Sequence, residues 1–203
     1  MPALALTDHG NMYGAIEFYK LAKAAGIKPI IGIEAYIANR SRLDKEPGID
    51  NQRFHLTLLA KNLQGYKNLM RLVTISHLEG FYYKPRMDKE SLRKYSAGLI
   101  ALSGCLGGEL GRALQNKDTE KAAGVVREYQ EIFGKENYFL EIQQRQNSIG
   151  GAELVRAGVI ELSKRLGVPL VATLDSHYPE PDDRKAHETL LAIQTNSDIK
   201  DEN

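Results

Sequence analysis

Short apolar runs alternate with longer amphipathic stretches along the whole chain. The apolar runs are typical of buried strands and predict strands at residues 3–7, 29–37, 55–60, 99–102, 138–142 and 168–174. The amphipathic stretches predict helices at about residues 13–25, 64–79, 107–133, 152–166 and 181–195. Two polar segments, 39–53 and 80–86, are expected to form loops, and the second leads to a short helix. Strands interleaved with helices in this regular way predict an α/β fold built on a parallel sheet or barrel.

No internal repeat, low-complexity tract or interdomain linker interrupts this pattern, so residues 1–203 are expected to form a single domain. The 27 basic and 26 acidic side chains leave a net charge of +1, so any nucleic-acid binding would have to be local. A single cysteine excludes an internal disulfide framework. No apolar stretch approaches the length of a membrane span, and no signal peptide is visible. These features predict a cytoplasmic protein that has no membrane partner.

Two short polar strings follow apolar runs at opposite ends of the chain: Thr7-Asp8-His9-Gly10 and Asp175-Ser176-His177. An apolar run that ends in Asp and His is typical of a strand whose C-terminal end opens into a polar site. Asp175 and His177 are two residues apart, so an extended backbone would direct both side chains to the same face. A carboxylate beside an imidazole suits a divalent metal ion. A simple turn is the alternative for either string.

Three further residues could join such a site. Glu34 lies within the second strand, and Cys105 follows the fourth. His55 stands at the start of the third strand and fits the pattern less well, because the C-terminal ends of parallel barrel strands converge on one mouth. Each has a plain alternative, since Glu34 could be a surface charge, Cys105 a buried apolar side chain, and His55 a core histidine. Taken together, they favour a metal cluster.

Several longer strings carry a family resemblance, and they lie at residues 5–14 (ALTDHGNMYG), 26–36 (GIKPIIGIEAY), 54–62 (FHLTLLAKN), 65–69 (GYKNL), 78–83 (LEGFYY), 98–107 (GLIALSGCLG) and 169–195. In these strings the chain resembles the PHP (polymerase and histidinol phosphatase) domain of bacterial replicative DNA polymerase III alpha subunits. The resemblance covers nearly all of the chain. It is weaker to stand-alone histidinol phosphatases and to the error-prone alpha paralogues.

The resemblance implies a distorted, TIM-like (β/α)7 barrel with up to three divalent metal ions (Zn, Mn or Mg) at its C-terminal mouth. Position by position, it implies six metal ligands: His9, Glu34, His55, Cys105, Asp175 and His177. It also implies metal-assisted hydrolysis of a phosphate ester, such as the 3′ end of a primer in a 3′–5′ exonuclease reaction, or of pyrophosphate. We expect the catalytic residues to be Asp8, His9, Asp175 and His177. A helix-capping role for Asp8 is an equal alternative.

At the level of the parent protein, the resemblance implies a DNA-directed DNA polymerase, a nucleotidyltransferase of DNA replication. Its partners would be DNA at the primer terminus, a proofreading exonuclease subunit and a sliding clamp. Two other functions compete with this one. The chain could be a stand-alone phosphoesterase similar to histidinol phosphatase, or a non-catalytic scaffold that docks the proofreading subunit.

Two departures from the family pattern qualify these expectations. The family opens with a strand that carries a His-x-His pair, whereas this chain begins at Met1-Pro2-Ala3, where the second strand is expected. We therefore expect an excised piece with six strands, lacking the first βα unit and part of the metal cluster. Its open edge beside residues 3–7 would favour dimerisation or aggregation. Leu174 also replaces the usual Asn before Asp175, which would loosen the orientation of that ligand.

Some residues of the polar loops could contact phosphate or a base. The cations with this potential are Arg40, Arg42, Lys84 and Arg86. A solvated loop charge is the more ordinary interpretation of each. Tyr82 and Tyr83 could stack on a base, although packing on the barrel rim is commoner. His77 and His187 fall in the middle of helices and are interpreted as structural.

Overall fold

The computed structural model of the protein describes residues 1–143 and 151–197. The chain divides into two compact units, residues 1–172 and 173–203, and each is described by itself. The strands are β1 (Ala3–Leu6), β2 (Lys28–Ala38), β3 (Arg53–Ala60), β4 (Phe81–Tyr82), β5 (Lys84–Met87), β6 (Leu99–Leu102), β7 (Tyr138–Gln143) and β8 (Leu170–Thr173). The helices of the first unit are α1 (Ala15–Ala24), α2 (Leu63–Leu78), α3 (Lys89–Tyr95), α4 (Glu109–Gln115), α5 (Thr119–Phe133), the 3-10 turn η1 (Lys135–Asn137) and α6 (Ala152–Leu166). The second unit contains η2 (Pro181–Asp183) and α7 (Arg184–Thr195).

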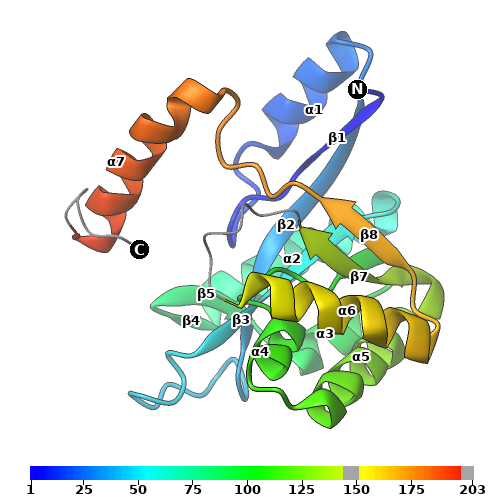
Figure 1. The fold of residues 1–203 in the computed structure, drawn as a ribbon. Coiled ribbons are helices and arrows are strands. Elements are labelled where there is room, and N and C mark those ends of the chain that lie inside the picture. The colour runs from blue at the N-terminus through cyan, green and yellow to red at the C-terminus, as the bar shows by residue number, and fades with distance from the viewer. Residues whose placement is uncertain (144–150, 198–203) are drawn as a thin grey trace. The chain divides into compact units, whose positions relative to one another are not determined.

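The strands form a curled, mixed sheet in the order β4-β5-β2-β3-β6-β7-β8, with β1 paired beside β2 (Figure 1). The pairs β1–β2, β2–β5 and β6–β7 are parallel, but β3 runs antiparallel to both β2 and β6. The expectation of a parallel sheet is therefore wrong at β3. The reason is the connection from β2 to β3, a polar loop without a helix, whereas a parallel return needs a crossover that is usually helical.

The sheet has eight strands within the described residues, not the six that were expected. The two additional strands, β4 and β5, arise from the segment predicted as a loop. They form a tight antiparallel hairpin around Tyr83, whose φ of +59° makes the sharp reversal. Pro85 lies within β5. Because proline is rare inside strands, the sequence pattern did not predict a strand here. The predicted helices are otherwise confirmed within a few residues, with 107–133 divided into α4 and α5.

The two faces of β2 and β3 have different roles. One face carries Ile33, Ala35 and Ile37 of β2, which are fully buried in the hydrophobic core with α2. The opposite face carries Glu34 and Tyr36, since alternate residues of a strand point to opposite sides. This alternation separates the core from a polar face on which chemistry can be built.

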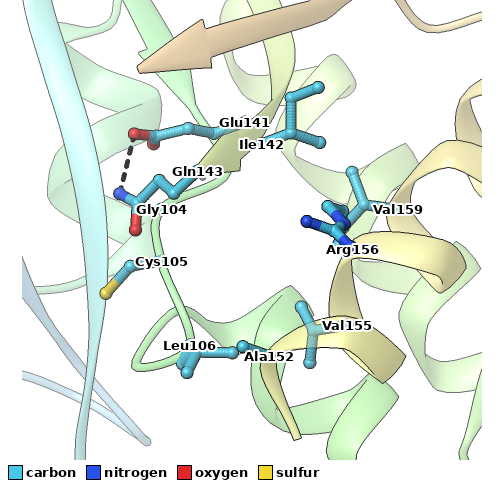
Figure 2. A pocket seen from close by; sticks show the side chains of 10 residues that line it. All are labelled: Gly104, Cys105, Leu106, Glu141, Ile142, Gln143, Ala152, Val155, Arg156 and Val159. Carbon is cyan, nitrogen blue, oxygen red and sulfur yellow. Dashed lines mark hydrogen bonds between the residues drawn. The ribbon is translucent and has the colours of Figure 1, made fainter. Parts of the chain in front are cut away.

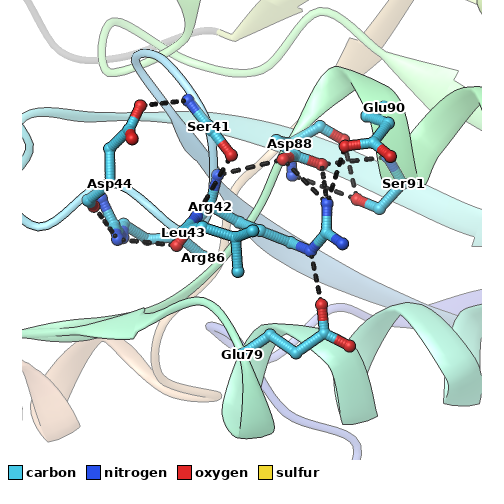
Figure 3. A network of polar contacts seen from close by, with 9 residues as sticks. All are labelled: Ser41, Arg42, Leu43, Asp44, Glu79, Arg86, Asp88, Glu90 and Ser91. Atoms are coloured by element: carbon cyan, nitrogen blue, oxygen red, sulfur yellow. Dashed lines mark hydrogen bonds and ion pairs between the residues drawn. The ribbon is translucent and has the colours of Figure 1, made fainter.

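The loop between β2 and β3 is fixed by buried arginine (Figure 3). Arg86 is fully buried, and its guanidinium donates to backbone carbonyls at 2.8–3.1 Å. The acceptors are the carbonyl oxygens of Gly80, Asp50, Arg42 and Asp44. Arg42 in turn contacts the carboxylates of Asp88, Glu79 and Glu90 at 2.8–3.1 Å. We call this set the arginine network.

Within the part of the chain that the structure describes, no helix has both the length and the apolarity needed to cross a bilayer.

Candidate metal centre

The chain beyond β1 lies alongside β2 and carries His9 next to Glu34. The Gly10 N–H donates to the Glu34 carbonyl and the Glu34 N–H donates to the Asp8 carbonyl, both at 3.0 Å. Gly10 adopts a φ of +70°, and a Cβ at this position would lie 2.8 Å from Cγ of Pro85, so only glycine fits the turn. As a result, His9 Nε2 lies 3.4 Å from Glu34 Oε2.

His55 reaches the same place from the antiparallel strand β3. Its residue pairs with Tyr36 of β2, so both side chains occupy the polar face. His55 Nδ1 lies 2.5 Å from Glu34 Oε1. The position of His55 at the start of its strand looked unfavourable only because β3 was expected to be parallel. An antiparallel strand begins at the edge where its neighbour β6 ends.

His9, Glu34 and His55 together form the candidate metal centre of the described residues. Each offers one ligand atom, and these atoms all lie within 4.8 Å of one another. The Glu34 side chain is 12% exposed, against 25% for His55 and 39% for His9, so the group opens toward solvent at His9. Two imidazoles and a carboxylate are a donor set that zinc and manganese accept. The residues present therefore fit a divalent cation.

The electrostatics of His55 reflect its neighbours. Burial disfavours the protonated imidazole, but contacts with Cys105 and Glu34 outweigh burial and raise the pKa of His55 to about 9. The Glu34 carboxylate directs one oxygen toward each imidazole, since Oε1 faces His55 and Oε2 faces His9. Glu34 is thus the residue that joins the two histidines.

Cys105 lies at the margin of this group, on the loop that follows β6. Its Sγ is 3.9 Å from His55 Nδ1 and accepts a hydrogen bond from the Gly107 N–H at 3.4 Å. The loop follows β3 closely, because the His55 N–H donates to the Gly107 carbonyl at 3.0 Å. A Cβ on Gly104 would lie 2.6 Å from the His55 carbonyl oxygen, which explains the glycine. The structure therefore places Cys105 beside His55, and its role as a ligand stays a prediction.

Asp8 lies next to the centre in sequence, and its side chain approaches the start of α1. A Cβ added at Gly14 would lie 3.9 Å from Asp8 Oδ2. The alternative of a helix cap is not realised, since no side chain of the described residues caps α1 at Gly14. A catalytic role for Asp8 stays a prediction.

Asp175 and His177 belong to the second unit. Asp175 has a φ of +53°, so the backbone turns there and is not extended, contrary to expectation. The turn nevertheless keeps the pair in contact, with His177 Nδ1 at 2.8 Å from the Asp175 carbonyl and 3.8 Å from Oδ1. The His177 ring also lies 5.5 Å from that of His187. The participation of Asp175 and His177 in one centre with His9 stays a prediction.

Comparison with known protein families shows to which family this chain belongs. A model of the PHP domain matches residues 1–145, most of the first unit, including the three donors and Cys105. The chain belongs to the PHP domain family. It is also similar to curated proteins named DNA polymerase III subunit alpha, from Thermus aquaticus (48% identical over 202 residues) and Borreliella burgdorferi (47% over 204 residues). A third, from Deinococcus radiodurans, is 46% identical over 216 residues.

These alignments cover nearly all of this chain but little of the relatives. They include 98%, 100% and 100% of this PHP domain chain, and 16%, 18% and 15% of the respective relatives. The chain thus spans about a sixth of the length of the curated relatives it matches. It is homologous to one part of a DNA polymerase III alpha subunit.

Sequence reasoning missed one acidic residue of the PHP domain, Glu141 on β7. The side chain is only 7% exposed; it accepts from Thr57 Oγ1 at 3.4 Å and from Gln143 Nε2 at 3.2 Å. Glu141 and Cys105 both line a cavity of about 30 Å³ (Figure 2). A charged residue within an apolar strand was the available signal, and Glu34 had been singled out within such a strand.

The four cations that were predicted as possible phosphate contacts have different partners in the structure. Arg40 pairs with the buried Asp50 at 2.6 Å, while Arg42 and Arg86 belong to the arginine network. Their charges are therefore committed to fixing the loop. Lys84 is different, because its Nζ lies 5.9 Å from the ring centroid of Tyr36, on the polar face of the sheet.

Proposed function

We propose that this chain is the PHP domain of a DNA polymerase III alpha-type subunit, and that its centre is a metal-dependent phosphoesterase of the 3′–5′ exonuclease type. The observation that carries the proposal is the convergence of His9, Glu34 and His55 within 4.8 Å. The similarity to proteins named DNA polymerase III subunit alpha supports the polymerase context. In that context the parent chain is a DNA-directed DNA polymerase of the cytoplasm. DNA, a proofreading exonuclease subunit and a sliding clamp would be its partners.

We further propose that residues 1–203 belong to one (β/α)7-type PHP domain, which in its intact form would bind up to three ions of zinc, manganese or magnesium. The ions would be held by His9, Glu34, His55, Cys105, Asp175 and His177. Bound divalent cations would lower the pKa of water and offset charge on phosphoryl oxygens. Asp8, His9, Asp175 and His177 would contribute to catalysis.

The chain's own contribution is to hold the donors in a fixed arrangement. Backbone hydrogen bonds fix Glu34 to the segment of His9, and another fixes His55 to the loop of Cys105. A ligand set carried on strands is held more rigidly than one carried on loops. Because His9 is the most exposed donor, a substrate would approach the centre from the side of His9.

A non-catalytic scaffold is the second candidate, and one observation favours it. The ion pair between Glu34 and His55, together with the nearby Cys105 sulfur, joins β2, β3 and the loop after β6. These contacts would stabilise the fold without hydrolysis. A stand-alone phosphoesterase remains distinguishable by activity on small phosphate monoesters.

Metal stoichiometry measured by mass spectrometry after dialysis tests the proposal, with Glu34→Gln as the decisive variant. Glu153→Gln is the matched control, because its side chain is 89% exposed and lies on α6. The wild type and the control should bind zinc or manganese and shorten a primer from its 3′ end, and Glu34→Gln should do neither. Metal without hydrolysis, or no metal at all, would favour the scaffold.

A further inference from the structure

Tyr36 is the centre of a second group of residues on the polar face. Its ring centroid lies 5.3 Å from that of His55 and 5.9 Å from that of His9. The Arg53 guanidinium carbon lies 5.5 Å from the ring centroid, and Lys84 Nζ lies 5.9 Å from it. Two cations therefore stand beside an aromatic ring that contacts both histidines of the candidate metal centre.

The sheet register explains why the two cations meet there. Arg53 lies two residues before His55 on β3, so both side chains occupy the same face. Lys84 lies on β5, which flanks β2 on the side away from β3. Tyr36 thus stands between cations contributed by its two neighbouring strands, and both cations are only partly exposed.

Arg53 and Lys84 differ from Arg40 and Arg42 in their charged partners. Among the described residues, neither Arg53 nor Lys84 makes an ion pair, whereas Arg40 and Arg42 make several. The guanidinium of Arg53 donates through Nη1 to the Asn51 carbonyl at 2.9 Å, but its Nε is buried and has no partner in the described part of the chain. Leaving a buried donor unpaired costs free energy, so such a group calls for an acceptor.

We propose that Arg53 and Lys84 form an anion subsite that binds a phosphate group of the substrate beside the metal centre. This inference rests on the proposed hydrolytic function. The planar guanidinium suits phosphoryl oxygens on the β3 side of Tyr36 and the ammonium suits them on the β5 side, while cation–π contacts with Tyr36 hold both groups in place. The substrate class is therefore a phosphate ester whose phosphoryl oxygens face Arg53 and Lys84 while its scissile bond faces His9 and His55.

The chain offers a matched control at another tyrosine. Arg71 and Lys94 lie 5.8 Å and 5.4 Å from the ring centroid of Tyr95, and among the described residues neither makes an ion pair. No histidine or carboxylate lines the groove at Tyr95, within the described residues. If cation–π packing alone explains these pairs, substitution of the cations at Tyr36 and at Tyr95 will have the same effect on phosphate binding.

The test is calorimetric titration of the full chain with inorganic phosphate, with and without zinc. Arg53→Gln and Lys84→Gln should each weaken phosphate binding about tenfold, as expected for loss of a charge-assisted hydrogen bond. Arg71→Gln and Lys94→Gln should change the affinity less than about twofold. Arg53→Lys should restore part of the loss, since it keeps the charge without the planar fork.

Metal content measured on the same samples separates this inference from the proposed function. Normal zinc content with reduced phosphate affinity in Arg53→Gln and Lys84→Gln supports the subsite. Equal phosphate affinity in all four glutamine variants, or no phosphate binding by the wild type, overturns it whatever the metal content. Loss of zinc from the wild type contradicts the proposed function instead, and the metal-free titration still reports on Arg53 and Lys84.

Discussion

The arginine network and the candidate metal centre are two polar clusters of the first unit. They differ in how their charged groups are paired. In the network, every nitrogen of the Arg86 guanidinium donates to a fixed backbone carbonyl. In the centre, one carboxylate faces two imidazoles, and the cations nearby have no carboxylate partner among the described residues. The arginine network stabilises a loop, whereas the donors of the candidate metal centre are arranged so that they can bind a cation.

The largest expected effect follows from removing the Arg86 guanidinium from the arginine network. Arg86→Met removes the donors of four backbone carbonyls and should lower the free energy of unfolding by about 3–5 kcal/mol. Urea unfolding followed by circular dichroism measures the change. Lys84→Met, two residues earlier on the same strand, is the control and should cost less than about 1 kcal/mol. Equal losses in the two variants would contradict a special role for Arg86.

In the candidate metal centre, substitution of Glu34 should affect metal binding more than folding. Glu34→Gln removes the carboxylate that faces both histidines and should weaken zinc binding at least about a hundredfold. Competition with a chromogenic chelator measures the affinity. Unchanged zinc affinity in this variant would show that the centre is not the zinc site.

A smaller change is expected at the margin of the centre. Cys105→Ser replaces a sulfur that lies 3.9 Å from His55 Nδ1 with a poorer zinc ligand of similar size. Zinc affinity should fall about tenfold. The cadmium-substituted wild type should show a thiolate charge-transfer band that the variant lacks. A variant with the band intact would exclude Cys105 as a ligand.

The smallest effect concerns pH and belongs to the network. Burial alone would raise the pKa of Asp88, but hydrogen bonds from the Arg42 and Ser91 N–H groups and the Arg42 charge lower it below its usual value. Because the pKa in the folded state is lower than in the unfolded state, the carboxylate stabilises the fold above about pH 4. This contribution should be lost as the pH falls through the folded-state pKa.

Unfolding free energies between pH 5 and pH 2 check this expectation in the wild type and in Asp88→Asn. Asparagine can still cap α3, so the variant removes the titration and keeps the cap. Asp118→Asn is the control, since Asp118 caps α5 and makes no ion pair among the described residues. A pH dependence in Asp88→Asn that equals that of the wild type would exclude Asp88 as its source.

The comparison also shows which features a sequence can reveal. The apolar runs predict where strands lie, and so they place His9 and Glu34 correctly at the polar ends and faces of strands. Periodicity carries no information on strand direction, and this is why the antiparallel course of β3 and the favourable position of His55 were not anticipated. Arg86 looked like an ordinary loop charge, because its burial depends on carbonyls from residues 42–50 and Gly80.

Other features depended on backbone detail. The left-handed φ of Asp175 is unusual for a residue other than glycine, so the extended geometry expected for the Asp-x-His string was wrong. The proposed subsite at Tyr36 involves three strands whose register only the structure provides. Lys84 was considered as a phosphate contact, but Arg53 was not.

Anomalous diffraction from crystals of the zinc-loaded chain, recorded on both sides of the zinc edge, tests the central claim most directly. The account predicts an anomalous peak within coordination distance of His9, Glu34 and His55. A peak elsewhere, with the Glu34–His55 pair still in direct contact, would contradict it.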